Sequence, residues 1–352
     1  MQQVKQGDIV MRTPRDLCLA AAYGPEWLSP GSPSISASSV VTLLLLERER
    51  NGKDKEYLDT LPTTKELKNL PVLWSDQEAQ MLHGTQSGIS RQELLASWKN
   101  DFEAIKLRNC PFQISWHQWL EAHALVMSRS YNLPHLDYAL VPFLDYINHN
   151  DEPNAEPIFD DNNDFVELHI LRDTPANTQI FSSYAGGGAT NLDGLKMFQA
   201  FGWLEPGLCD CNIDLIQALR RDDPFAQQKI QLLMHRPDQG RLLLSLPPNG
   251  PTGHILTQAI DSILLPSLHI ITATDPFIEN SINKDDSVAI RAGIKLLDRK
   301  IKLLDTSAHI RRIASTGEKV DPRRRELAYA TAAQERLALD TLRFTLRTLI
   351  IA

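Results

Sequence analysis

Two segments of the chain carry side chains whose types and spacing could do chemistry. In the first, an apolar run that begins at Leu140 ends in a turn from which Asp145, Asn148 and His149 emerge together. In the second, a run rich in strand formers ends at Tyr184, and a glycine loop follows it. A carboxylate, an amide, an imidazole and a phenol provide both hydrogen-bond donors and acceptors. The two segments therefore predict a polar corner with a tyrosine at a strand end.

Each of these residues alone is more often structural than functional. An Asn-His pair in a turn is commonplace, and a tyrosine at the end of a strand usually packs against its neighbours. The aromatic pair Phe201 and Trp203, separated by Gly202, is equally unspecific when taken alone. A functional interpretation must therefore rest on all of these motifs together and on their order along the chain.

The elements that position these residues follow from local pattern. From Tyr57 to Trp119 the sequence is helical in character, whereas from Tyr138 short strand-like runs are separated by Asn, Asp and Pro turns. The acidic run at residues 160–164 is expected to be such a turn, because it lacks the spacing of a calcium loop. After Pro206 helical patterns return. Two β segments around a helical insertion predict an α+β fold. In the last predicted helix the leucines are spaced to line one face: Leu339, Leu342, Leu346 and Leu349.

In order and spacing, the motifs resemble those of the SET-domain lysine methyltransferases, in the branch typified by the Rubisco large-subunit methyltransferase. The first group of matching positions is Val141-Pro142, Asp145, Asn148-His149, Ser183-Tyr184 and Phe201-Gly202-Trp203. The helical block matches the inserted region of that branch at Leu46-Glu47-Arg48, Gly52, Tyr57-Leu58, Leu61-Pro62, Leu73-Trp74, Leu82, Gly84-Thr85, Trp119, Ala122, Val126 and Ser128-Arg129. Near the C-terminus, Glu335-Arg336 and Leu339 match its last helix. The resemblance covers nearly the whole chain.

The resemblance implies a two-domain architecture. Residues 1–206 are expected to form a SET-type β fold, interrupted by a helical insertion at about residues 36–135. Residues 207–352 are expected to form an all-α domain that binds the substrate.

It also implies an activity, the transfer of a methyl group from S-adenosylmethionine to a lysine side chain of a non-histone protein. Asn148, His149 and Arg129 are the expected cofactor-binding residues, and the Arg129 guanidinium is suited to pair with the cofactor carboxylate. Tyr184 is expected at the methyl-transfer centre. The attacking amine must be neutral, and an apolar channel favours its deprotonation.

The substrate side of the site is expected to include Phe201, which takes the place of a tyrosine that lines the lysine channel, and Arg129. Asp145 has two interpretations of equal weight: it contacts the substrate, or it braces the Asn-His turn.

The sequence departs from the family pattern at two places. The family's N-terminal glycine-rich strand is expected to be missing, and the loop before Asn191 is about four residues longer than usual. Two alternatives therefore stay open beside lysine methylation. One is a catalytically inactive protein-binding module, and the other is methylation of histidine on the same scaffold.

Composition limits the partners. The net charge of −8 argues against nucleic acid as the main partner, because phosphate binding needs a basic surface. The longest apolar run, Val40 to Leu46, is far shorter than the roughly 18–20 residues of a membrane span. Four scattered cysteines and the lack of a secretory start favour the cytoplasm or nucleus.

A pair of cysteines and a cluster of basic residues suggest two further sites. Cys209 and Cys211 occupy the place of a zinc cluster in many SET enzymes, but a tetrahedral site needs four ligands, so no metal is expected. The basic residues at 311–312, 319 and 323–325 could be an import signal or a docking site, although a solvated helix face is the commoner explanation.

Overall fold

The structure is a computed structural model that describes residues 3–25, 27–28, 35–108, 110–184, 194–204, 209–219, 222–246, 258–273, 286–315 and 319–351. The chain divides into two compact units. The first contains Met1–Leu73, Arg91–Leu192 and Gln199–Gly202. The second contains Trp74–Ser90, Asp193–Phe198 and Trp203–Ala352. The predicted boundary at residue 206 differs from this division, which assigns residues 74–90 and 193–198 to the second unit.

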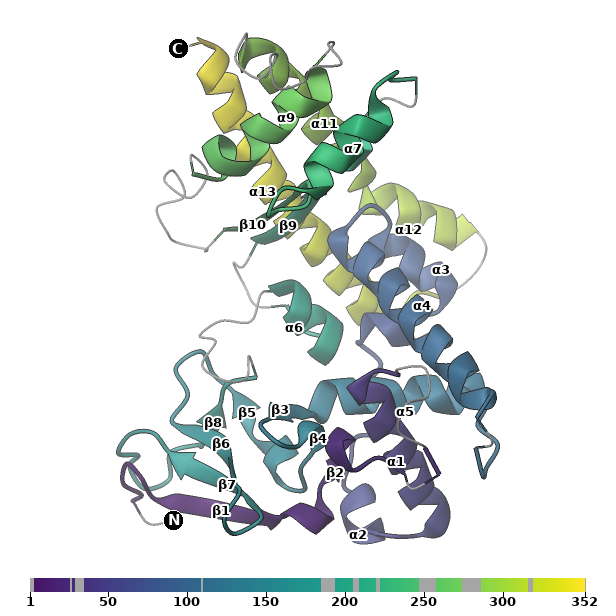
Figure 1. Ribbon diagram of the computed structural model, residues 1–352, viewed down its shortest axis with the longest axis vertical. Coiled ribbons are helices and arrows are strands. Elements are labelled where there is room, and N and C mark those ends of the chain that lie inside the picture. The colour runs from purple at the N-terminus through teal and green to yellow at the C-terminus, as the bar shows by residue number, and fades with distance from the viewer. Residues whose placement is uncertain are drawn as a thin grey trace. The chain divides into compact units, whose positions relative to one another are not determined.

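Short sheets form the β part of the first unit (Figure 1). One antiparallel sheet has the order β1 (Ile9–Pro14), β7 (Phe165–Ile170), β6 (Ala155–Asp160). A second has the order β2 (Leu19–Ala20), β4 (Asp137–Leu140), β3 (Tyr131–Leu133). The third is a parallel pair of two-residue strands, β5 (Asn148–His149) and β8 (Phe181–Ser182).

Strand composition and turn chemistry account for these sheets. Alternate residues of β7, Val166, Leu168 and Ile170, are almost fully buried in one apolar cluster. The turn between β6 and β7 is the predicted acidic run, and the Asp160 carboxylate accepts the backbone N–H of Asn162 at 2.9 Å. The acidic run is therefore a polar turn, as predicted.

Helices occupy the chain between β2 and β3, where the insertion is predicted, and residues 74–90 of this stretch belong to the second unit. Helix α1 (Ala37–Asn51) begins at the N-cap Ser36 and ends at Gly52, whose φ of 64° suits glycine. The other elements up to the second sheet are α2 (Lys55–Leu58), α3 (Asp76–Ala79), α4 (Gln86–Lys106) and α5 (Trp116–Arg129). Trp119 is fully buried, and its indole N–H donates to the Trp98 carbonyl at 3.2 Å. Aromatic burial thus holds α4 against α5.

Helices dominate the second unit. Besides α3 and the first turn of α4, they include α6 (Gly194–Phe201, which ends in the first unit), α7 (Ala226–Met234), α9 (Leu265–Thr272), α11 (Asp286–Leu303), α12 (Thr306–Ser315) and α13 (Pro322–Ile351). Of the leucines predicted to line one face of the last helix, Leu339, Leu342 and Leu346 are fully buried in the core of this unit. Leu349 is 45% exposed, so the buried face ends one turn earlier than predicted.

The prediction of an all-α C-terminal region is wrong in one detail. Strands β9 (Cys209–Asp214) and β10 (Arg241–Leu246) pair antiparallel in this unit. A continuous apolar run such as Leu242–Leu244 fits a buried strand as well as a buried helix, because it shows no alternation of polar and apolar residues. The sequence analysis predicted helix for this region. No helix in the described part of the chain is both long and apolar enough to cross a membrane.

Candidate active site

A pinned turn lies at the centre of the candidate site. The 3-10 turn η5 (Leu144–Tyr146) follows Phe143, whose φ is 68°, and leads into β5. Three side chains from different elements donate to backbone carbonyls in and just after this turn. They are Tyr131 to Leu144 (3.2 Å), Arg129 to Asp145 (2.6 Å) and Tyr184 to Ile147 (2.8 Å). We call Leu144–Ile147 with these donors the pinned turn. Its backbone is fixed by residues from α5, β3 and the end of β8.

The parallel bridge of β5 with β8 brings the two predicted segments together. Asn148 pairs with Phe181, and His149 pairs with Ser182. Asn154 secures the second segment, because its side chain accepts the N–H of Phe181 at 2.7 Å and donates to the Gln179 carbonyl at 3.0 Å. Sequence analysis missed Asn154, although an asparagine in a turn often replaces backbone hydrogen bonds in this way.

His149 links the bridge to Tyr184. The backbone N–H of Tyr184 donates to His149 Nδ1 at 3.1 Å, so a neutral ring carries its proton on Nε2. His149 Nε2 lies 3.2 Å from Asp151 Oδ1, and the imidazole side chain is only 5% exposed. Asp151 was not among the predicted site residues. It fixes the tautomer of the histidine that positions Tyr184.

Aromatic contacts complete this side of the site. The Tyr184 ring lies 5.2 Å from the His149 ring and 4.6 Å from the Phe201 ring, measured between centroids. Phe201 is followed by Gly202, whose φ is 74°. A Cβ at Gly202 would lie 2.9 Å from the carbonyl carbon of Asn69, so only glycine allows this close approach. The structure thus brings Tyr184, His149 and Phe201 together.

The Asp145 carboxylate is buried. The residue is 3% exposed, and the backbone N–H groups of Phe143 and Asp145 lie near the carboxylate, while no side chain in the described part of the chain donates to it. Burial raises the pKa of Asp145 to about 6, against the opposing effect of the nearby Arg129 guanidinium. One N–H group of Arg129 donates to the backbone carbonyl of Asp145. The two predicted roles of the Asp145 side chain, contact with the substrate and bracing of the turn, both stay predictions.

Tyr57, from the helical insertion, interacts electrostatically with the Asp145 carboxylate. Its ring is buried, and its hydroxyl has no hydrogen-bond partner among the described residues. Burial raises the pKa of Tyr57, and the Asp145 charge adds to that effect. Tyr57 was matched as a helical-insertion residue but was not predicted in the site. The sequence around a buried helical tyrosine does not indicate which distant residues lie near it.

Asn148 differs from its neighbours because it is exposed. Its side-chain amide makes no hydrogen bond within the described residues, so donor and acceptor both remain available for a ligand. Asn191 lies outside the described residues.

Comparison with known proteins identifies this arrangement. The sequence model of the SET domain matches residues 1–185, which is more than half of the chain. The chain belongs to the SET-domain family. A curated relative, SET domain-containing protein 4 of Artemia parthenogenetica, is 25% identical over 225 residues. That match covers 58% of this chain and only 54% of the relative, so it spans about half the relative's length.

Solved structures confirm the SET-domain fold. The SET domain of LSMT bound to lysine and AdoHcy superposes with a TM-score of 0.71 at 17% identity, over 99% of this chain and 84% of that one. Rubisco LSMT bound to AdoMet gives a TM-score of 0.68, also at 17% identity, over 99% and 83%. The predicted resemblance and the α+β class with a helical C-terminal region are therefore confirmed.

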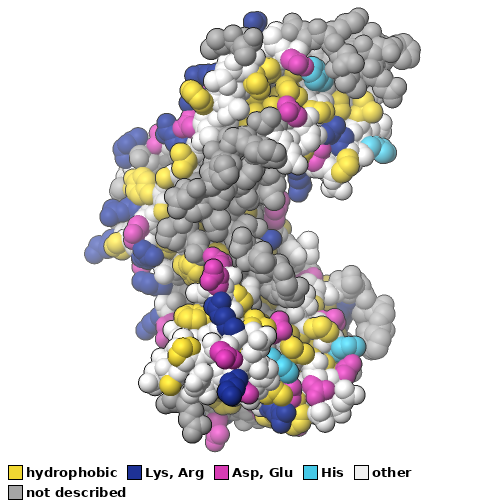
Figure 2. Space-filling model, turned by 90° about the vertical axis from the view of Figure 1, so that its left-hand side faces the viewer, with side chains coloured by type: hydrophobic (Ala, Val, Ile, Leu, Met, Phe, Trp, Pro, Cys, Tyr) yellow, Lys and Arg dark blue, Asp and Glu magenta, His cyan; other side chains and the backbone are white. Residues whose placement is uncertain are grey.

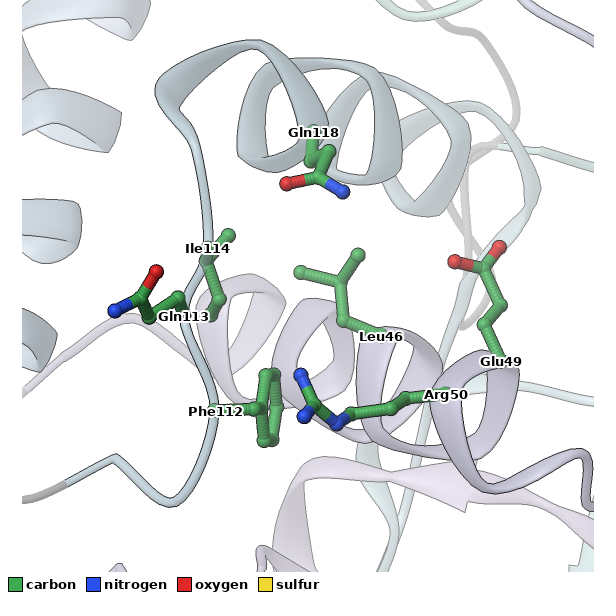
Figure 3. A pocket seen from close by; sticks show the side chains of 7 residues that line it. All are labelled: Leu46, Glu49, Arg50, Phe112, Gln113, Ile114 and Gln118. Atoms are coloured by element: carbon green, nitrogen blue, oxygen red, sulfur yellow. The ribbon is translucent and has the colours of Figure 1, made fainter.

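One cavity of the SET-domain unit lies apart from these residues (Figure 3). It has a volume of about 330 Å³, and none of its lining residues is a predicted site residue. Its lining is Leu46, Glu49, Arg50, Phe112, Gln113, Ile114 and Gln118. It belongs to the helical insertion rather than to the pinned turn.

Among the described residues, no three His, Cys, Asp or Glu side chains converge. The side chains of Cys209 and Cys211 lie outside the described set. In the predicted basic cluster, Arg324 pairs with Glu78, and Arg323 pairs with Glu326. On the face shown in Figure 2, basic and acidic side chains are interspersed.

Proposed function

We propose that this chain is an S-adenosylmethionine-dependent methyltransferase that acts on the side chain of a lysine in a non-histone protein. The observation that carries the proposal is the placement of Tyr184. Its backbone is bound to His149, its ring lies on Phe201, and its hydroxyl reaches the pinned turn. These contacts hold a phenol that interacts electrostatically with the buried Asp145 carboxylate, beside the short strand that begins at the exposed Asn148.

The residues present fit the cofactor. Asn148 offers a free amide, and the Arg129 guanidinium has further N–H groups beyond the one bound to Asp145, which suit a carboxylate. When bound, the cofactor supplies an activated methyl group on a sulfonium.

The chain's own residues then orient the acceptor and exclude water. Tyr184 and Phe201 form an aromatic wall that faces a cationic or alkyl chain favourably. His149 keeps Tyr184 in place through the backbone bond, and Asp151 keeps His149 in one tautomer. A structural relative was solved with lysine bound, which supports lysine as the acceptor.

Cofactor binding and product analysis test the proposal. Calorimetry with S-adenosylmethionine is expected to give a saturable isotherm, and Asn148→Ala is expected to weaken binding by on the order of 10-fold, the loss of one or two hydrogen bonds. Incubation of the protein with a cell extract and methyl-labelled cofactor is expected to yield labelled methyllysine after acid hydrolysis.

Other outcomes favour the alternatives. Labelled methylhistidine in place of methyllysine would assign the histidine activity. A folded chain that binds no cofactor would support the inactive protein-binding module instead.

A further inference from the structure

The cavity of the helical insertion holds charged groups that the candidate active site does not use. Its volume is about 330 Å³, and its lining comes from α1, residues 112–114 and the first turn of α5 (Figure 3). Cavities that bind small molecules begin at about 300 Å³, so the space suits a ligand of few atoms. None of the lining residues belongs to the candidate active site, so a ligand here would have a separate role.

The cavity has an apolar floor that is continuous with the core. Leu46 from α1 and Ile114 pack against the buried cluster that contains Trp119. Phe112 also lines the cavity, and its ring meets the Trp27 ring edge to face, with 6.3 Å between the centroids. Because these side chains are fixed by core packing, the floor is a preformed surface on which an apolar group can be buried.

Two opposite charges line the same cavity without pairing with each other. Glu49 and Arg50 are consecutive residues of α1, and consecutive side chains on a helix diverge by about 100°. The Arg50 side chain extends toward Phe112, with the guanidinium carbon 5.7 Å from the ring centroid, and the Glu49 carboxylate points away from it (Figure 3). Within the described residues neither charge has an ion pair, so both are available to a ligand.

The surroundings of the two charges favour a ligand further. Although Glu49 is an exposed residue, desolvation raises the pKa of its carboxylate, and a cation brought to it would offset that cost. Gln118 supplies an oriented donor. Its side-chain oxygen accepts the backbone N–H and the hydroxyl of Ser115 at 3.0 and 2.9 Å, so the amide nitrogen is left for a ligand.

We propose that this cavity binds a free α-amino acid with an apolar side chain. The ammonium group of the ligand pairs with Glu49, and its carboxylate pairs with Arg50 and accepts from the Gln118 amide. The apolar side chain lies on Leu46 and Ile114. A zwitterion complements both charges at once, whereas a purely cationic ligand would face Arg50 and a purely anionic one would face Glu49. The proposal does not depend on the proposed function.

Four small probes test the three parts of the proposed ligand. They are L-leucine, N-acetyl-L-leucine, which lacks the ammonium, L-leucinamide, which lacks the carboxylate, and glycine, which lacks the side chain. By saturation-transfer NMR titration, the full chain is expected to bind L-leucine with a Kd on the order of 0.1–1 mM, as suits a ligand of this size. Each of the other three probes is expected to bind on the order of 10-fold or more weakly, because one contact is lost.

Two charge-removing variants assign the contacts one by one. Glu49→Gln is expected to bind L-leucine no better than N-acetyl-L-leucine, while it still discriminates against L-leucinamide. Arg50→Gln is expected to show the converse, since it loses only the partner of the carboxylate. Both positions are exposed and helical, where glutamine is well tolerated, and thermal melting checks the fold. The matched control Glu56→Gln, at an exposed position of α2, is expected to keep the wild-type affinities.

Three results would overturn the inference. The first is the absence of saturable L-leucine binding. The second is equal affinity of the wild-type chain for L-leucine and its two derivatives, which would indicate recognition of peptide-like amides instead of a zwitterion. The third is unchanged discrimination in folded Glu49→Gln and Arg50→Gln, which would place any leucine site elsewhere. The titrations use neither cofactor nor turnover, so they leave the methyltransferase proposal to its own test.

Discussion

At the scale of single residues, the site depends on backbone bonds made by side chains. Tyr184 donates to the Ile147 carbonyl while its own N–H donates to His149. The phenol is thus connected at both ends to the segment that carries the Asn-His pair. A catalytic tyrosine positioned in this way contributes mainly in the transition state, where hydrogen-bond geometry matters most.

Tyr184→Phe tests that role. Turnover is expected to fall about 10²-fold or more, since a well-placed hydrogen-bonding group is lost. Affinity for S-adenosylmethionine is expected to change only a few-fold, because the ring and the bond to His149 remain. Single-turnover kinetics and calorimetry measure the two quantities. Near-normal turnover would leave the tyrosine with a packing role only.

Asp145→Asn is expected to stabilise the protein at neutral pH. The native pKa of about 6 exceeds the ordinary value of 3.8, so the native state binds the proton more tightly than the unfolded chain. Stability therefore falls as pH rises between about 4 and 6, by up to about 3 kcal/mol. The amide avoids this cost, so urea denaturation is expected to show the variant more stable at pH 7.5 and equal to wild type near pH 4. A less stable variant at pH 7.5 would contradict the assignment of a desolvated carboxylate whose pKa is raised by burial.

At the scale of elements, one ion pair ties two distant parts of the second unit. Glu78 closes a capping box on Ser75 at the start of α3, and its carboxylate also accepts from Arg324 near the start of α13. Both side chains are mostly buried, at 11% and 15% exposure. The neighbouring pair of Arg323 with Glu326 is exposed. Both pairs join an arginine to a glutamate, but they differ in burial, and only Glu78 also caps a helix.

Glu78→Ala is expected to destabilise the protein by roughly 3–5 kcal/mol, because a mostly buried ion pair and a helix cap are both lost. Glu326→Ala, the control, is expected to change stability by less than about 1 kcal/mol, as exposed pairs do. Chemical denaturation of the full chain measures both. Similar effects for the two variants would show that the Glu78 pair is not desolvated.

The sequence predicts elements better than it predicts their partners. The Asp160 turn, the N-cap of α1 and the aromatic core of the insertion follow from local chemistry and are found in the structure. Of the site, the contacts of Tyr184 with His149 and Phe201 follow from the family resemblance. Tyr57 and Asn154 could not be predicted, because their roles arise from packing between segments far apart in the chain.

At the scale of the whole molecule, the second unit is discontinuous in sequence. Residues 74–90 belong to it, and Trp74, Met81 and Leu82 are buried in one cluster with Ile313 and Leu327. The helical pattern of residues 74–90 in the sequence does not indicate that they belong to the second unit. The C-terminal region is thus not an independent appendage, since it provides the apolar partners of a segment that lies early in the chain.

A chain truncated after residue 204 tests this arrangement. The fragment is expected to expose the side chains of Trp74, Met81 and Leu82, which are almost fully buried in the full chain. It is therefore expected to bind the dye ANS strongly and to aggregate, whereas the full chain does neither. Fluorescence titration and light scattering measure the difference. A monomeric fragment with no dye binding would show that residues 74–90 fold without the C-terminal partners.

The same discontinuity has a consequence for synthesis on the ribosome. Met81 and Leu82 emerge more than two hundred residues before Ile313 and Leu327, which cover them in the finished protein. At a synthesis rate of about 5–20 residues per second, roughly 10–50 s pass between the synthesis of the first pair and that of the second. During that interval the nascent chain lacks the part of the apolar cluster that Ile313 and Leu327 contribute. We therefore expect the protein to depend, more than one with sequential domains, on chaperones that act during translation.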